Sequence, residues 1–126
     1  MIAPLNWGLG HASRDIPIIR ELLKQNADVI IAANGRALEF MRKEFPGLRW
    51  IRLPGFEIRL QEKGSLTLKI LGQLPKFIAS FFSERKQLNK IIASEHIDAV
   101  ISDNRYGLYT RKIPCVFITH QTGIIA

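Results

Sequence analysis

Two short stretches of this 126-residue chain place side chains that can move protons or bind anions beside flexible backbone. The first, residues 6–14, has the sequence N-W-G-L-G-H-A-S-R, and the second is D-N-R at residues 103–105. Glycine lets a ligand approach the backbone, and a histidine that is partly neutral near pH 7 can accept a hydroxyl proton. With a second histidine near the end of the chain, the candidate site residues are Gly8, Gly10, His11, Arg14, Asp103, Asn104, Arg105 and His120.

Two of these residues are candidates for the catalytic base. We expect His11 to take the proton of an attacking hydroxyl group, because it stands where a glycine loop runs into a helix. Asp103 is the rival base, or the group that orients His11. The alternatives are a packed or helix-capping histidine and an aspartate that serves only as a turn residue.

The other candidates are expected to bind substrate. The glycine loop offers backbone N–H groups and a helix N-terminus to an anion, and an arginine can bind phosphate through its planar fork. The alternatives are turn glycines without a ligand, a solvated loop arginine and a histidine that merely closes a strand. The residues concerned are Gly8, Gly10, Arg14, Asn104, Arg105 and His120.

Strand and helix patterns alternate around these stretches. Short apolar runs predict strands over residues 2–5, 29–33, 48–53, 99–102 and 115–119. Helical spacing predicts helices over about 13–25, 37–45 and 65–95. This order indicates an α/β, Rossmann-like parallel sheet in strand order 3-2-1-4-5 with helices on both faces. The loops after strands one, four and five should then converge at the carboxyl edge of the sheet.

Several local features of the helices follow from residue type. Ser13 is expected to cap the first helix with Asp15 in its first turn, and Pro17 fits only if that helix begins late or with a distorted first turn. Pro75 is expected to split the long helical segment in two. The expected apolar face of that segment consists of Ile70, Leu74, Phe77, Ile78, Phe81, Leu88, Ile91 and Ile92.

Other ligand sites fit the sequence less well. A dinucleotide fingerprint needs glycine or alanine at the third place of its loop and an acid about 20 residues later, but Ser13 and Asn34 occupy those places. No P-loop motif occurs, and His11, His96 and His120 lack the spacing of a zinc site. We therefore expect no metal and no cofactor, and an NAD-dependent dehydrogenase domain is the weakest alternative.

Composition and chain ends indicate the setting. The length suits one domain over residues 1–126, and the single Cys115 lies in an apolar run, which suggests a core residue and a reducing compartment. No membrane span or secretory signal is recognisable, so we expect a cytoplasmic protein. The first strand begins at once and no helix follows the last one, so we expect a fragment of a longer protein.

Positive charge is concentrated in one region. Between Arg52 and Lys90, eight basic residues stand against three acidic ones, which accounts for five of the seven net positive charges. The same region has more apolar residues than one helical stripe needs. This combination suits peripheral contact with anionic lipid, and the alternative is a solvated basic face with a lid packed on another domain. Nothing resembles a nucleic-acid-binding motif, so we expect no nucleic acid.

The glycine loop resembles a known family. Residues 7–14 are similar to the first loop of GT-B glycosyltransferases related to the peptidoglycan N-acetylglucosaminyltransferase and the galactolipid synthases, and residues 102–107 and 119–121 resemble later loops of that group. The resemblance covers the chain as an N-terminal half only. It implies an acceptor-binding domain whose nucleotide-sugar donor, a UDP-sugar by analogy, is held mainly by an absent C-terminal domain, with a glycan or lipid-linked acceptor.

The expected function is therefore the acceptor half of a hexosyltransferase-type enzyme, inactive by itself and peripheral to the inner face of the membrane. A non-enzymatic α/β module that binds a small molecule or phosphate remains the alternative, because it would use the same glycine loop without needing His11 as a base.

Overall fold

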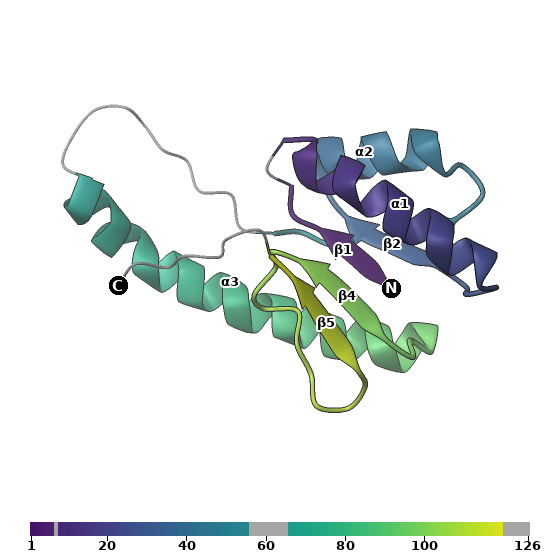
Figure 1. Ribbon diagram of the computed structural model, residues 1–126. Helices are drawn as coiled ribbons and strands as arrows, with labels where there is room; N and C mark the ends of the chain where they lie inside the picture. The colour runs from purple at the N-terminus through teal and green to yellow at the C-terminus, as the bar shows by residue number, and fades with distance from the viewer. Residues whose placement is uncertain (7, 56–65, 120–126) are drawn as a thin grey trace.

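The computed structural model describes residues 1–6, 8–55 and 66–119 of the chain. Three helices and five strands alternate along it (Figure 1): β1 (Ile2–Pro4), α1 (Gly10–Lys24), β2 (Ile30–Ala33), α2 (Gly35–Glu44), β3 (Arg49–Arg52), α3 (Leu66–Glu95), β4 (Val100–Asp103) and β5 (Cys115–Ile118). Each predicted strand is present, and each of its ends lies within one residue of the predicted position.

The five strands form one parallel sheet in the order β3-β2-β1-β4-β5, as predicted. Its register places Pro4 of β1 beside Asp103 of β4, and Asp103 beside Ile118 of β5. The carboxyl ends of these three strands are therefore level with one another at one edge of the sheet. The strand order reverses between β1 and β4, which is where a ligand binds in sheets of this kind.

Two apolar clusters cover the two faces of the sheet. Helices α1 and α2 pack on one face through residues such as Ile19 and Met41, and the carboxyl half of α3 packs on the other through Leu88. Successive strand residues alternate between the clusters, since Ala3 and Ile2 belong to opposite ones. Strands buried on both faces explain the unbroken apolar runs in the sequence.

Helix α1 begins earlier than predicted. It starts at Gly10 with Leu9 as the N-cap residue, and no side chain caps it. Ser13 is therefore not the cap; its hydroxyl group donates to the Gly10 carbonyl at 3.0 Å. Asp15 lies beyond the first turn, and Pro17 is inside the helix, so those two expectations were wrong as well. Pro17 is exposed, as is Ser13, whose carbonyl loses its helical donor and can bond to water instead.

Helix α3 is continuous through Pro75, contrary to the predicted break. Proline at this position removes the donor to the carbonyl of Leu71, and both residues are exposed. Water can replace the lost hydrogen bond on an exposed helix face, whereas it could not do so in a core. The helix therefore continues for 30 residues, or about 45 Å.

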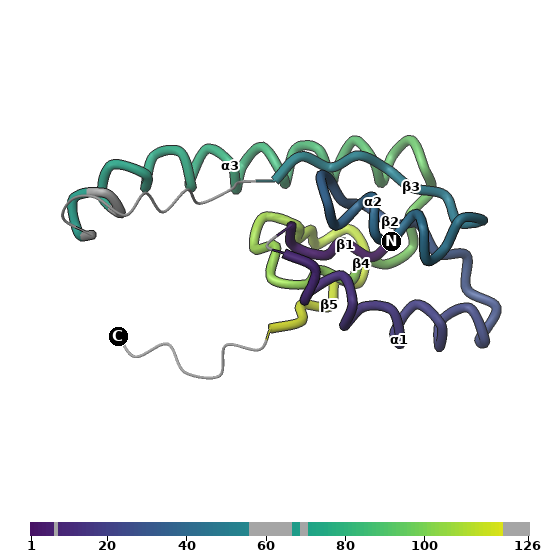
Figure 2. The backbone as a smooth tube through the Cα atoms, turned by 90° about the horizontal axis from the view of Figure 1, so that it is seen from above, coloured from purple at the N-terminus to yellow at the C-terminus, as the bar shows by residue number. Residues whose placement is uncertain are grey.

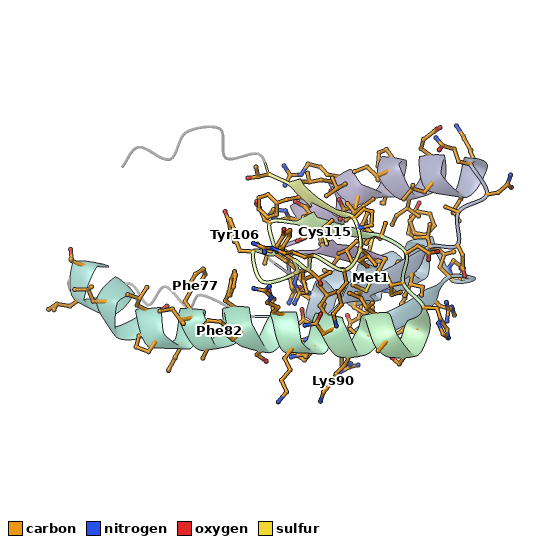
Figure 3. The ribbon with its side chains drawn as sticks, turned by 90° about the horizontal axis from the view of Figure 1, so that it is seen from below. Met1, Phe77, Phe82, Lys90, Tyr106 and Cys115 are labelled. Carbon is orange, nitrogen blue, oxygen red and sulfur yellow. The ribbon has the colours of Figure 1, made fainter. Side chains whose placement is uncertain are left out.

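The amino half of α3 extends beyond the carboxyl edge of the sheet, as both views show (Figures 1 and 2). The predicted apolar face accordingly divides in two. Its carboxyl half, with Leu88, Ile91 and Ile92, packs against the sheet. The extending half carries exposed apolar side chains, among them Phe77 and Phe82 (Figure 3), and the full set is Leu68, Leu71, Leu74, Phe77, Ile78 and Phe82.

Candidate functional site

The register of the sheet brings the two predicted catalytic residues together. Asp103 is the last residue of β4, and its carbonyl accepts a hydrogen bond from the N–H of Leu5, just after β1, at 3.1 Å. The chain then passes through the glycine loop into α1, whose second residue is His11. Two residues 92 positions apart in the sequence therefore meet at the switch point.

His11 and Asp103 form a buried hydrogen-bonded pair. His11 Nδ1 lies 3.0 Å from Asp103 Oδ2, and the two side chains are 8% and 2% exposed. A carboxylate can only accept, so Nδ1 carries the proton in this bond and Nε2 keeps its lone pair. This is the tautomer that a histidine needs in order to accept a proton at Nε2.

Arg14 also approaches the imidazole ring of His11. Its Nη2 atom lies 3.1 Å from His11 Nδ1, the atom that bonds to Asp103. A guanidinium group only donates, so Nδ1 cannot accept from Arg14 while it donates to Asp103. We assign the Nδ1 proton to the hydrogen bond with Asp103, because the Asp103 carboxylate can only accept and therefore needs a donor at Nδ1. Arg14 then contributes positive charge beside the pair from a side chain that is exposed.

The glycine loop leaves its backbone open. Gly8 has a φ of +71°, a conformation that suits glycine, and a Cβ atom built at Gly8 or Gly10 would meet no atom of the described residues within 4 Å. The positive φ of Gly8 turns the chain between the end of β1 at Pro4 and the start of α1 at Gly10. Of the two glycines only Gly8 needs its conformational freedom; Gly10 is the first residue of the helix.

A second helix is tied to the same loop. The Asn6 Oδ1 atom accepts the N–H of Ala37, in the first turn of α2, at 3.2 Å. Gly35 permits this contact, because its φ is +54° and a Cβ atom there would lie 2.6 Å from the Asn6 side chain. The start of α2 therefore fixes the beginning of the glycine loop from the side of β2.

Asp15 belongs to this site although the sequence did not predict it. It is 1% exposed, lies one turn after His11 on α1, and neither of its carboxyl oxygens has a hydrogen-bond partner in the described residues. Burial, with the negative charge of Asp103 adding to it, raises the pKa of the Asp15 carboxyl from 3.8 to about 7, against an opposing effect of Arg14. The position of Asp15 along the helix could have predicted its burial. Asp15 lies on the same side of α1 as Ala12 and Ile19, which are both fully buried.

Asn104 and Arg105 follow Asp103 but differ in their surroundings. Asn104 is buried with a φ of 55°, and its N–H donates to the carbonyl of Ile118 at 3.0 Å, so it joins the ends of β4 and β5. Asparagine tolerates this left-handed conformation better than most residues. Asn104 thus remains at the carboxyl edge of the sheet, where the sequence placed it.

Arg105 lies on the α3 side of the sheet. Its guanidinium group donates to Glu84 Oε1 from Nη2 at 2.7 Å and from Nε at 3.1 Å, and also to the carbonyls of Leu53 and Pro54. The side chain is 1% exposed. These bonds join α3, the segment after β3 and the segment after β4. Arg105 is therefore engaged in holding the fold together, and we leave it out of the candidate site.

The other predictions concern His120, Cys115, a metal site and a membrane span. His120 and Trp7 lie outside the described residues. Cys115 is half-buried and packs against the α3-side cluster, so it contacts the core but is not one of the fully buried residues that the prediction expected it to join. Within residues 1–6, 8–55 and 66–119, no group of three or more histidine, cysteine or carboxylate side chains could hold a metal ion. None of the helices in those ranges has both the length and the hydrophobicity to cross a bilayer.

Comparison with protein-family models, with curated proteins and with solved structures gives no match.

The candidate site combines three chemical features. A histidine with its Nδ1 proton bonded to an aspartate has a proton acceptor at Nε2, the adjacent loop offers open backbone at a helix N-terminus, and an exposed arginine stands beside the pair. Such an arrangement can remove a proton from a hydroxyl group and stabilise a nearby anion.

Proposed function

We propose that this chain is the acceptor-binding half of a glycosyltransferase that uses a nucleotide-sugar donor. The observation that carries the proposal is the buried His11–Asp103 hydrogen bond at the switch point of the sheet. Transfer of a sugar to a hydroxyl group needs a base, and the pair leaves His11 Nε2 as the acceptor. Asp103 orients the ring and stabilises the positive charge that His11 gains, as in other histidine–aspartate pairs.

The sugar donor is assigned to a second domain downstream of this one. The resemblance of the glycine loop to that of the GT-B group supports this division of labour, with a UDP-sugar as the expected donor. The first test is the coding sequence after Ala126, which should encode a second α/β domain with an acid placed for the donor ribose.

The acceptor is proposed to be lipid-linked or a glycan, presented at the inner face of the cytoplasmic membrane. The extending half of α3 supports the lipid reading, since Leu71, Ile78 and Phe82 are exposed there. Along α3, Lys76, Arg85, Lys86 and Lys90 are exposed, whereas Glu84 is buried and paired with Arg105. Exposed apolar and basic side chains on one helix favour binding to anionic lipid.

The base is tested in the two-domain protein by replacing His11 with Ala. The expected result is a loss of about 10²- to 10⁴-fold in kcat, the usual contribution of general-base catalysis, with little change in Tm. A control variant, His96→Asn, changes an exposed histidine after α3 whose φ of 52° also suits asparagine, and should keep full activity. The 126-residue chain alone should fold cooperatively and transfer no sugar.

Two outcomes would change this proposal. If Asp103→Asn abolishes turnover while His11→Ala retains most of it, the base is Asp103 and His11 only positions the acceptor. If neither substitution affects function but changes in the glycine loop abolish binding of a small phosphorylated ligand, the domain is a non-enzymatic binding module. The open backbone at Gly8 and Gly10 is the observation that favours this second candidate.

The proposal that α3 binds anionic lipid is tested by cosedimentation of the chain with vesicles. Binding to phosphatidylglycerol vesicles should fall as salt rises, because charge contributes much of the attraction. Lys86→Glu with Lys90→Glu should weaken it by about 30-fold or more, since each basic residue near the surface contributes about 1 kcal/mol and the new carboxylates repel anionic lipid. Lys24→Glu with Lys43→Glu, which gives the same net charge on α1 and α2, is the control. Equal binding to neutral and anionic vesicles, or none to either, would leave α3 as a surface that packs on the donor domain.

A further inference from the structure

Strand β3 ends the sheet on the side away from β5. It pairs with β2 on one side, and no strand in residues 1–6, 8–55 and 66–119 pairs with it on the other. The N–H of Leu53, directly after β3, donates inward to the Ala33 carbonyl at 2.9 Å. Backbone groups of successive strand residues point to alternate sides, so Trp50 and Arg52 direct their N–H and C=O groups outward. An edge of this kind can accept an added strand.

A pocket of about 380 Å³ opens beside this edge, between the end of α2 and β3. Phe45, Leu48 and Trp50 contribute apolar surface to it, and the Arg42 guanidinium group lies 4.3 Å from the centre of the Trp50 ring. Trp50 nevertheless remains 41% exposed. Tryptophan and arginine are the residue types that most often dominate binding at protein interfaces. The pocket therefore suits an apolar side chain that packs against Trp50.

The same surface carries positive charge that the described part of the chain does not neutralise. Arg42 and Lys43 line the pocket, and Arg52 lies two residues after Trp50, on the same face of β3. Within the described ranges, none of these three side chains forms an ion pair, whereas Arg49 is paired with two carboxylates. The pocket is lined by a single carboxylate, that of Glu39. A molecule that complements this surface is therefore acidic.

A second copy of this chain would fit the edge poorly. Antiparallel pairing of two β3 strands, centred on a twofold axis, would place Arg49 opposite Arg52 of the second copy. Like charges directly opposite each other destabilise a sheet, and cationic side chains on an edge strand oppose self-association. An added strand that carries carboxylates would meet the same arginines favourably.

We propose that the outer edge of β3 and the pocket beside it bind an acidic, extended segment of a partner protein, which adds a strand to the sheet. The backbone of the segment bonds to Trp50 and Arg52, and one of its apolar side chains packs against the Trp50 ring. Its carboxylates pair with Arg42, Lys43 and Arg52. This surface contains neither His11 nor Asp103, so the proposal does not depend on the proposed function.

The experiment measures amide hydrogen exchange by NMR in the 126-residue chain, with and without a probe peptide. The probe is a soluble peptide in which glutamate alternates with valine around a central phenylalanine. The N–H groups of Trp50 and Arg52 should exchange readily in the free chain and become protected when the peptide is bound. Those of Ile51 and Leu53 point towards β2 and should be protected in both states. A peptide of the same charge with proline in place of the central residues should not protect Trp50 or Arg52.

A pair of matched variants tests the role of charge. Arg42→Gln with Lys43→Gln should weaken peptide binding by about 2- to 30-fold, the effect of losing two exposed ion pairs. Arg85→Gln with Lys86→Gln is the control, because it removes the same two exposed side chains from α3 and should leave the affinity unchanged.

Four results would overturn the proposal. One is the absence of saturable peptide binding. A second is binding without protection of Trp50 and Arg52, or with equal weakening in the control variant, which would mean that only the net charge of the chain attracts the peptide. A third is equal binding of a short oligothymidylate at the same residues, which would assign the surface to nucleic acid. The fourth is a change in the Trp50 and Arg52 amide signals with the concentration of the chain alone, which would assign it to a second copy.

Discussion

On the α3 side of the sheet, Arg105 and Glu84 form a buried ion pair whose guanidinium group also donates to two backbone carbonyls. On the α1 side, His11 and Asp103 form an equally buried pair, but a third ionisable group, Asp15, lies one helical turn after His11 with no hydrogen-bond donor among the described residues. Buried charges normally have partners, so the first cluster follows the general rule and the second departs from it. We take the departure as the mark of a functional site.

The two clusters also differ in what they hold together. Arg105 links three separate segments, and Gly107 supports it: a Cβ atom there would lie 2.7 Å from Glu84 Oε2 and 2.8 Å from the Phe81 carbonyl of α3. The loop after β4 is therefore pressed against α3. On the α1 side, the His11–Asp103 bond joins the start of α1 to the end of β4, near the glycine loop at Gly8. One cluster supports the edge of the sheet, and the other faces the side where a ligand would bind.

Among substitutions in the two clusters, Arg105→Met should cause the largest loss of folding stability. Removal of one partner of a buried ion pair leaves an uncompensated charge at Glu84, and such changes destabilise proteins by about 3–5 kcal/mol. The free energy of unfolding from urea denaturation would measure it. Arg20→Met is the control, because its pair with Glu44 is exposed and should contribute less than about 1 kcal/mol.

A double variant sharpens the test. In Arg105→Met with Glu84→Met no charge is left unpaired, so much of the lost stability should return. The sequence predicted that Arg105 binds substrate. That prediction would be supported if the Arg105→Met variant kept native stability but lost acceptor binding. Equal instability of the single and double variants would mean that the bonds to the Leu53 and Pro54 carbonyls matter more than the pairing with Glu84.

The sequence predicted the fold and the meeting of His11 with Asp103 for one reason. Both depend on periodic apolar runs, and once the strand order 3-2-1-4-5 is inferred, the carboxyl ends of β1 and β4 must be neighbours. The place of Arg105 could not be predicted in the same way. Its guanidinium group bonds to Glu84 and to carbonyls 51 and 52 residues away, and no local pattern encodes those contacts.

The errors in helix bounds have local physical causes. Pro17 and Pro75 were expected to delay or break helices, but each lies on an exposed face where water can bond to the freed carbonyl. Asp15 was expected near the start of α1 because acids are common in first turns. Its helix phase, shared with Ala12 and Ile19, was the better guide, since that stripe faces the core.

The smaller expected effect, and the more direct test of the contrast between the clusters, is the pH dependence of stability due to Asp15. Its folded-state pKa is about 7 and its model value is 3.8, so between about pH 4 and pH 7 the native state holds a proton that the unfolded chain has lost. Stability from this group is fully present below pH 4 and is lost as pH rises to 7. Asp15→Asn should therefore match the native chain near pH 4 and be more stable at pH 8, by up to about 4 kcal/mol, because asparagine cannot ionise.

Urea denaturation of both chains at pH 4.5, 6 and 8 would measure the difference, with Asp98→Asn correcting for the loss of one negative charge from a basic protein. A gap that widens with pH would show that the native chain keeps a carboxyl group at the cost of stability, as expected where charge serves function. A constant gap would mean that Asp15 is ionised throughout or has a donor in solution. In that case the α1-side cluster would follow the same rule as Arg105 and Glu84, and its departure could no longer be used to identify the site.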